Sequence, residues 1–179
     1  VWIISGPSGV GKGTVCARLR ELRPGIHIPV SLTTRKPRPG EVDGISYHFV
    51  SEQRFREKVD SGELLENAVV HGRYSYGTPR GEVVDAIASG RDVLLEIDLQ
   101  GARQVKRNLP EAKLVFIAPP SWEELVRRLT GRGTENASQV EHRLATARVE
   151  LEAREEADFV IVNDRIEDTA QALIVLMGL

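Results

Sequence analysis

The fold is decided by the stretch Gly6-Pro7-Ser8-Gly9-Val10-Gly11-Lys12-Gly13-Thr14. Four apolar residues precede this stretch and a helical pattern of apolar side chains follows it, which predicts a strand, a glycine-rich loop and a helix in that order. The spacing G-x-x-x-x-G-K allows successive backbone N–H groups to surround a phosphate group at the positive end of the helix. Lys12 adds a full positive charge, which would reach the terminal phosphates of a nucleotide. We therefore interpret residues 6–14 as a phosphate loop (P-loop) rather than as an ordinary glycine-rich turn.

The residue after Lys12 departs from the usual pattern of such loops. That position normally carries Ser or Thr, whose hydroxyl binds magnesium, but here it is Gly13, and the hydroxyl comes one residue later at Thr14. We therefore expect no direct metal ligand from the loop, with Mg²⁺ held mainly by nucleotide phosphates and water. Asp98 or Glu96, at the end of a predicted buried strand, is the expected carboxylate beside the metal, and a turn or helix-cap role for Asp98 is the alternative.

Length, charge and cysteine content limit the classes of function. The chain has 179 residues, 41% of them hydrophobic, which fits one compact domain. A net charge of −2 argues against a general nucleic-acid binder, and without an apolar run of membrane length we expect no membrane partner. The single cysteine, Cys16, excludes an internal disulfide framework. Together with the lack of a signal-peptide pattern, these features predict a cytoplasmic protein, and they leave the oligomeric state open.

After the loop, strand patterns alternate with helix patterns. Apolar runs at residues 92–97, 113–118 and 158–162 predict strands, and helices are expected to begin near residues 79, 121, 138 and 167. Ser121 and Glu124 have the spacing of a capping box for the second of these helices. We therefore predict an α/β fold in which a parallel sheet is wrapped by helices, with the ligand cleft at the carboxyl ends of the strands.

Residues 31–78 interrupt this alternation and predict a small inserted module. Ser51 is expected to cap a short helix with Phe55 and Val59 facing inward. A strand follows over residues 63–71, and the Gly- and Tyr-rich residues 72–77 are expected to form turns.

The helix after the module is expected to start at a Thr-Pro pair. Thr78 would cap it and Pro79 would open it, because proline is favoured in the first helical position. Val83, Val84 and Ile87 would be its apolar side chains.

Two clusters of arginines are candidates for binding phosphate. Residues 33–41 form a cationic loop in which two prolines restrict the backbone, so that Arg35, Arg38 and the nearby Tyr47 could hold a phosphate group of a second ligand. Arg132, in a polar loop, and Arg143, on the helix after it, are placed to reach a phosphate chain. A solvated basic loop and a charged surface helix are the respective alternatives.

The chain resembles the guanylate kinases, a family of nucleoside-monophosphate kinases. The specific pattern is Thr33-Thr34-Arg35 followed by Arg38, Glu41, Gly44 and Tyr47-His48-Phe49, and the resemblance extends over nearly the whole chain. It implies a P-loop core, a GMP-binding region and a mobile lid within one domain. The corresponding residues are 1–30, 79–126 and 144–179 for the core, 31–78 for the GMP-binding region and 127–143 for the lid.

The resemblance also implies the reaction and the residues that perform it. The reaction is the Mg²⁺- and ATP-dependent phosphorylation of GMP, and of dGMP, to the diphosphate with release of ADP. The implied ATP-binding residues are Gly6, Pro7, Ser8, Gly9, Val10, Gly11, Lys12, Gly13, Thr14 and, near the adenine, Asn163. The implied GMP-binding residues are Ser31, Glu66 and Thr78 at the guanine, Arg35, Arg38, Tyr47 and Tyr76 at the phosphate, and Asp98 beside them. The implied catalytic residues are Lys12, Arg38, Arg132 and Arg143.

Some assignments stay open at the level of sequence. The segment 72–77 is one residue longer than the family's usual pattern, so either Tyr74 or Tyr76 could hold the GMP phosphate, and Tyr76 is preferred because it adjoins Gly77. Two other functions remain as alternatives. One is a non-catalytic guanylate-kinase-like module that binds phosphopeptides, and the other is a kinase for a different phosphorylated acceptor.

Overall fold

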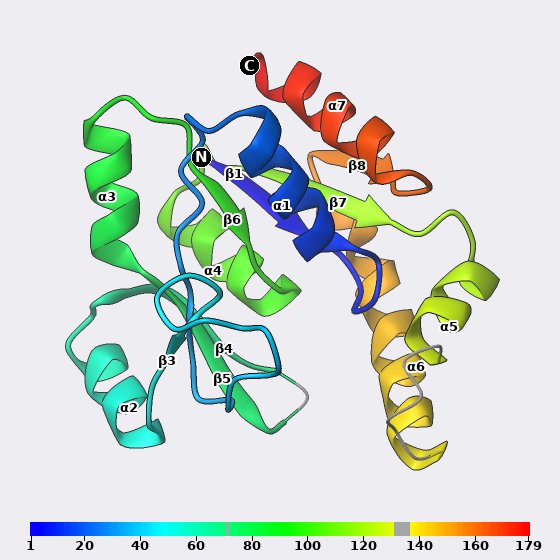
Figure 1. Cartoon of the computed structure of the whole chain (residues 1–179), viewed down its shortest axis with the longest axis horizontal. Helices are drawn as coiled ribbons and strands as arrows, with labels where there is room; N and C mark the ends of the chain where they lie inside the picture. Colours follow the sequence, from blue (N-terminus) through cyan, green and yellow to red (C-terminus); the bar gives the residue numbers. More distant parts are fainter. Residues whose placement is uncertain (71, 131–136) are drawn as a thin grey trace.

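The computed structural model describes residues 1–70, 72–130 and 137–179, and its core is a parallel β-sheet (Figure 1). In the described residues the strand order is β6-β1-β7-β8. The strands are β1 (Trp2–Ser5), β6 (Leu94–Glu96), β7 (Lys113–Ala118) and β8 (Phe159–Val162). Every neighbouring pair is parallel, which confirms the predicted α/β architecture.

Helices cover both faces of this sheet because alternate strand side chains point to opposite faces. Ile4 and its neighbours pack against α1 (Lys12–Leu22) and α7 (Ile166–Met177). Ile3 packs on the other face with α3 (Arg80–Ala88) and α4 (Leu99–Asn108). Helix α5 (Trp122–Thr130) follows β7 and packs on the same face as α1, with Leu125 and Leu129 buried there. Helices therefore cover both faces of the inner strands, whereas the edge strand β8 is largely exposed.

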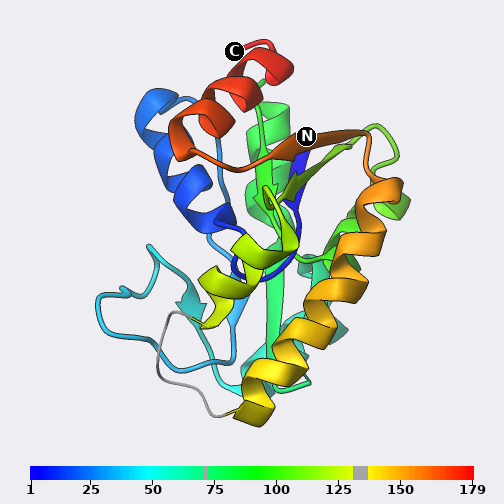
Figure 2. The same cartoon turned by 90° about the vertical axis from the view of Figure 1, so that its right-hand side faces the viewer.

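A long helix runs down one side of the molecule towards the second sheet (Figure 2). This is α6 (Ala137–Glu152), which continues into a short 3₁₀ helix, Ala153–Glu156, before β8. Ala147 is fully buried against the core, whereas most of the other described side chains of α6 are polar or partly exposed. The helix is therefore anchored to the core through Ala147.

The chain between α1 and α3 forms a second sheet of its own with the order β3-β2-β5-β4. Its strands are β2 (Leu32–Thr33), β3 (His48–Phe49), β4 (Leu64–Val70) and β5 (Tyr74–Pro79), and α2 (Glu52–Asp60) packs beside them. A small apolar cluster of Leu32, Phe55 and Leu64 holds this layer together. The predicted insertion therefore folds as a separate layer.

Several local predictions are confirmed and others are wrong. Ser51 accepts a hydrogen bond from the Arg54 amide at 3.1 Å, as predicted. Ser121 accepts one from the Glu124 amide at 3.1 Å, but the Glu124 carboxylate accepts from Arg127 and Arg128, so this cap is present as the serine half of the predicted capping box. The predicted turns at residues 72–77 are instead largely strand β5, because antiparallel pairing with β4 supplies partners for its backbone groups.

The start of α3 also differs from the prediction. Thr78 does not cap this helix, since its hydroxyl donates a hydrogen bond to Glu66 and Pro79 takes the N-cap position. Val84 and Ile87 are exposed rather than buried, as is Val59 in α2, because only one side of each helix meets another layer. Helix α4 was not predicted at all, because its sequence is mostly polar.

None of the helices in the described ranges is both long enough and apolar enough to span a bilayer.

Candidate active site

The phosphate loop lies between β1 and α1, and its glycines are required by the space around them. Gly6 has a φ of 145°, and a Cβ there would lie 2.3 Å from the carbonyl oxygen of Ile117. Gly11 has a φ of 98°, and its Cβ would lie 2.7 Å from Nδ2 of Asn163. Both positions therefore exclude a side chain sterically as well as by backbone conformation.

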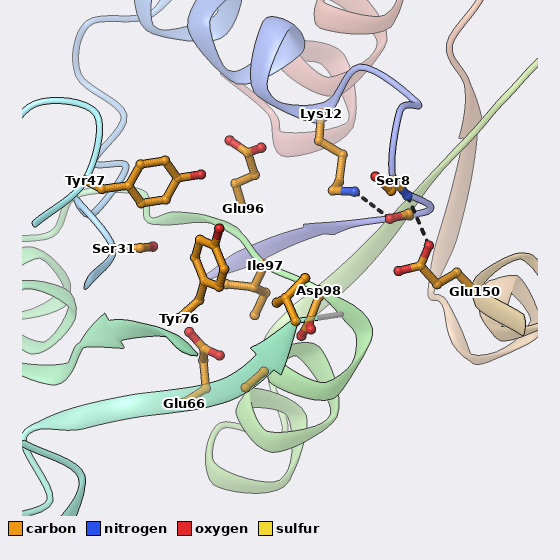
Figure 3. Close-up of a pocket in the computed structure, with 13 residues that line it drawn as sticks. Ser8, Lys12, Ser31, Tyr47, Glu66, Tyr76, Glu96, Ile97, Asp98 and Glu150 are labelled. Atoms are coloured by element: carbon orange, nitrogen blue, oxygen red, sulfur yellow. Dashed lines mark hydrogen bonds between the residues drawn. The ribbon is translucent and has the colours of Figure 1, made fainter. Parts of the chain in front are cut away.

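The Lys12 side chain folds back over this loop (Figure 3). Its Nζ donates hydrogen bonds to the carbonyl oxygens of Gly6 at 2.5 Å and Pro7 at 3.1 Å. Burial lowers the pKa of Lys12, and the carboxylates of Glu96, Glu150 and Asp98 oppose this effect. The ammonium group is therefore surrounded by acidic side chains at the mouth of the loop.

Asn163 supports the loop from behind. Its Nδ2 donates to the Val10 carbonyl oxygen at 2.8 Å, and its Oδ1 accepts from the Thr169 hydroxyl at 2.9 Å. The residue is 1% exposed, so its side chain fixes the shape of the loop. Its predicted place near the adenine stays a prediction, and what the structure adds is this supporting contact.

Glu66 lies on β4 and points into the site with an unusual environment for a carboxylate. It is 4% exposed, and Oε1 accepts a hydrogen bond from the Thr78 hydroxyl at 2.6 Å. Burial raises the pKa of Glu66 to about 7, with the Thr78 hydrogen bond opposing and the charge of Asp98 adding to this rise. Helix α4 approaches so closely that a Cβ on Gly101 would lie 2.3 Å from Glu66 Oε2.

Arg35 is buried and held by several partners at once. Its guanidinium group forms a two-pronged ion pair with Glu41, at 2.9 and 2.8 Å, and its Nε donates to the Tyr76 hydroxyl at 3.1 Å. The same group lies 5.4 Å from the ring centre of Tyr47. Glu41 also accepts a hydrogen bond from the Arg38 amide at 2.7 Å. Glu41 therefore orients this loop, a role that was not predicted, because the sequence marks Glu41 only as part of the family pattern.

A single cavity brings the loop and the second sheet together (Figure 3). The phosphate loop lines one end, and the second sheet and the end of β6 line the other. The predicted site residues that line this cavity are Gly6, Ser8, Lys12, Ser31, Tyr47, Glu66, Tyr76, Glu96 and Asp98.

Other predicted residues lie behind or outside this cavity. Arg35 and Thr78 lie behind it and contact lining residues, and Arg38 is exposed on the loop. The guanidinium of Arg73 lies 5.0 Å from the ring centre of Tyr74, which does not line the cavity. Arg132 lies outside the described residues.

The end of β6 supplies two carboxylates beside the loop. A Cβ on Gly13 would lie 3.4 Å from Glu96 Oε1, so this carboxylate faces the position where other phosphate loops carry a hydroxyl. Asp98 caps α4, because its Oδ1 accepts from the Gly101 amide at 2.8 Å, and it also lines the cavity. Oxygen ligands of this kind suit a hard cation such as Mg²⁺. Within the described ranges, no three His, Cys, Asp or Glu side chains are grouped so that they alone could hold a metal.

Helix α6 also contacts the phosphate loop, through Glu150 and Arg143. The Ser8 amide donates a hydrogen bond to Oε2 of Glu150 at 3.0 Å, and Nη2 of Arg143 donates to the Ser8 hydroxyl at 3.4 Å. Arg143 was predicted at this site, whereas Glu150 was not, because its partner lies 142 residues away in the chain.

Comparisons with known proteins are consistent with this arrangement. The family model described as guanylate kinase matches residues 1–178. Guanylate kinases from Leifsonia xyli subsp. xyli and Streptomyces kasugaensis are 55% and 57% identical over 175 residues, which is 98% of this chain and 69% and 85% of theirs. The crystal structure of guanylate kinase from Anaplasma phagocytophilum has a TM-score of 0.84 and 36% identity, covering 99% of this chain and 84% of that chain.

Proposed function

The chain belongs to the guanylate kinase family, and on that premise we propose that it transfers a phosphoryl group from ATP to GMP through the cavity between the phosphate loop and the second sheet. The family supports this function rather than the alternatives of a phosphopeptide-binding module or a kinase for another acceptor. The products are ADP and GDP, and dGMP is a further acceptor.

One observation carries the assignment of the site. The phosphate loop and the Glu66 carboxylate line the same cavity, so a nucleotide phosphate and a purine base can be bound on opposite sides of it. A donor held by the loop and an acceptor held by the second sheet would then meet above the ends of the parallel strands, where ligands bind in open α/β sheets.

Guanine selectivity follows from the chemistry of Glu66. Guanine presents its N1–H and its exocyclic amino group side by side, and one carboxylate can accept a hydrogen bond from each. Adenine has a bare N1 at that position and would leave the buried carboxylate without a partner. Rejection of the wrong base by such a site is on the order of 10⁴-fold when burial is complete. Ser31 and Thr78 lie close enough to complete the base site.

The phosphate of GMP would be bound by the aromatic and basic groups around Arg35. Tyr47 and Tyr76 line the cavity directly, and Glu41 fixes the Arg35 guanidinium against the Tyr76 hydroxyl. Arg38, exposed on the same loop, is the acceptor-side cation that would turn inwards.

Phosphoryl transfer requires little covalent work from the protein and much charge neutralisation. Lys12 and the loop amides would bind the donor phosphates. Arg143, which contacts Ser8 of the loop, and Arg132, which lies outside the described residues, would neutralise the transferred group.

Mg²⁺ is the cofactor that this chemistry requires, and the residues present are compatible with it. Since Gly13 has no hydroxyl, Glu96 and Asp98 are the groups that would hold the ion through water. When bound, Mg²⁺ neutralises part of the negative charge on the phosphates of ATP.

The test is a coupled assay of ADP release with ATP and Mg²⁺ and with GMP, AMP, UMP or CMP as acceptor. ADP release with GMP and almost none with the others is the expected result. Equal turnover with AMP would contradict the assignment of Glu66, and turnover with none of the four, in a folded protein that binds GMP, would favour the binding-module alternative.

A further inference from the structure

The contact between Glu150 and Ser8 brings a carboxylate to a group that binds phosphate. The Ser8 amide belongs to the loop whose N–H groups are proposed to hold the donor, and Oε2 of Glu150 accepts its hydrogen bond at 3.0 Å. The carboxylate also lies near enough to Lys12 to influence its charge. Glu150 thus contacts an amide of the loop and interacts electrostatically with its lysine, the two kinds of group that would bind a terminal phosphate.

A carboxylate and a phosphate cannot share this amide. Both are anions, the contact is half-buried, and like charges repel strongly where water is scarce. A phosphate that takes the Ser8 N–H must therefore first displace the Glu150 side chain. Because Glu150 is on α6, that displacement also breaks a contact between this helix and the loop.

We propose that Glu150 competes with the donor nucleotide for the phosphate loop, so that ATP binding is coupled to release of α6 from the loop. This inference rests on the proposed donor role of the loop. The apparent affinity for any phosphate chain is then reduced by the fraction of molecules in which Glu150 holds the amide. Arg143, seven residues earlier on the same helix, contacts the hydroxyl of the same Ser8, so loss of the Glu150 contact would let this arginine exchange Ser8 for the phosphates that it is proposed to neutralise.

The variant Glu150→Gln separates competition from simple anchoring. The glutamine amide oxygen can still accept the Ser8 hydrogen bond, so the helix remains attached, but the negative charge is gone. Competition predicts that dissociation constants for ATP, ADP and inorganic tripolyphosphate fall about fivefold to tenfold, because the neutral hydrogen bond of glutamine is roughly half as strong as the charge-assisted bond that it replaces. The constant for GMP should not change. Calorimetry in EDTA measures these values without a contribution from metal.

Glu152→Gln provides the matched control. Glu152 lies on the same helix and is exposed, so the substitution changes net charge by the same amount away from the loop. All dissociation constants should stay at the wild-type value in this variant. An equal fall in the ATP dissociation constant in both variants would show that the effect comes from net charge alone, which would overturn the proposal.

The remaining outcomes are also decisive. Unchanged ATP affinity in Glu150→Gln would show that the carboxylate only anchors α6 to the loop. Weaker ATP binding would show that Glu150 helps to bind the donor. Either result would overturn the proposal. Glu150→Ala, checked for folding by thermal unfolding, should show the same tightening. Absence of GMP phosphorylation by the wild-type protein would instead contradict the proposed function, which this comparison of affinities does not measure.

Discussion

Burial of Lys12 lowers its pKa and so opposes its positive charge. Its Nζ is hydrogen-bonded to two loop carbonyls, and three carboxylates stabilise its charged form. Lys12→Ala is expected to lower turnover by about 10²–10³-fold, because a charged group that stabilises the transferred phosphoryl is removed. Steady-state kinetics measure this loss, and calorimetry should show GMP affinity changed less than twofold. Lys113→Ala, an exposed substitution, is the control, and unchanged turnover in Lys12→Ala would contradict its role.

The buried carboxylate of Glu66 should make GMP binding depend on pH. Burial raises the pKa of Glu66 to about 7, and only the ionised form can accept both N–H groups of guanine. GMP affinity should therefore rise as pH increases through about 7 and fall below it, where the protonated form dominates. Titration calorimetry between pH 5.5 and 8.5 measures this profile.

The substitution Glu66→Gln tests the source of that profile. The variant should bind GMP weakly and lose the inflection near pH 7, because the Glu66 carboxyl group is gone, while the titration of the GMP phosphate at about pH 6 remains. Glu111→Gln, on the surface, should keep the wild-type curve. An inflection near pH 7 that survives in Glu66→Gln would assign the pH dependence to another group.

At the scale of elements, the position of α4 depends on the absence of a side chain at Gly101. A glycine in a helix interior costs about 1 kcal/mol relative to alanine, so Gly101 weakens α4. It also allows the helix backbone to lie against Glu66, with no room for a methyl group. Gly101→Ala should therefore displace the Glu66 carboxylate and weaken GMP binding about tenfold while leaving ATP binding unchanged.

Two further variants make this prediction specific. Gly81, on α3, has no atom within 4 Å of its Cβ position, so Gly81→Ala should raise helix stability without changing GMP affinity. Adding Glu66→Asp to Gly101→Ala shortens the carboxylate and should restore part of the affinity, as measured by calorimetry. Equal GMP affinity in Gly101→Ala and the wild type would show that the carboxylate can move aside at no cost.

Elements set by local signals could be predicted from the sequence. The strand before the phosphate loop, the loop itself and the caps at Ser51 and Ser121 depend on residues within one turn or strand of each other. Strand β5 was interpreted as turns because of its Gly and Ser content, although Tyr74, Tyr76 and Thr78 favour a strand, and pairing with β4 makes it one. Helix α4 was missed although Ala102 and Val105 lie three residues apart on its buried side, which is the spacing of an amphipathic helix.

The sequence predicted which residues belong to the site better than it predicted the contacts among them. Lys12, Glu66 and Tyr76 were identified from motifs, and all three line the cavity. The partners that orient or oppose them, Glu41 and Glu150, are charged residues with nothing distinctive in their local sequence. Their contacts depend on the tertiary fold, and in the case of Glu150 on a helix near the other end of the chain.

At the scale of the whole molecule, the two sheets differ in how firmly they are built. The second sheet has a cluster of its own of only Leu32, Phe55 and Leu64 and joins the core through Leu65 of β4, whereas the inner strands of the parallel sheet are packed on both faces. Residues 32–79 should therefore exchange amide hydrogens faster than the core, because few apolar contacts resist local opening. GMP should slow this exchange and ATP should not.

Phe55→Ala tests whether that cluster carries the stability of the second sheet. Removing a buried aromatic ring typically costs about 3–5 kcal/mol, so the variant should speed exchange in residues 32–79 and leave β1 and β7 protected. Hydrogen-exchange mass spectrometry measures both regions in one experiment. Loss of protection in both sheets together would show that the molecule unfolds as one unit.

The second sheet has a further consequence, which concerns how such proteins diversify. The chain enters and leaves this layer at neighbouring points, since the amide of Val30 on the way in donates to Glu82 on the way out. The segment between them is continuous, and its described residues, 31–70 and 72–79, share no strand pairing with the parallel sheet. Evolution, or a chimera, could exchange that segment and alter which acceptor is recognised without rebuilding the phosphate loop. On the proposed function, the acceptor site would then be a replaceable unit and the donor site a fixed one.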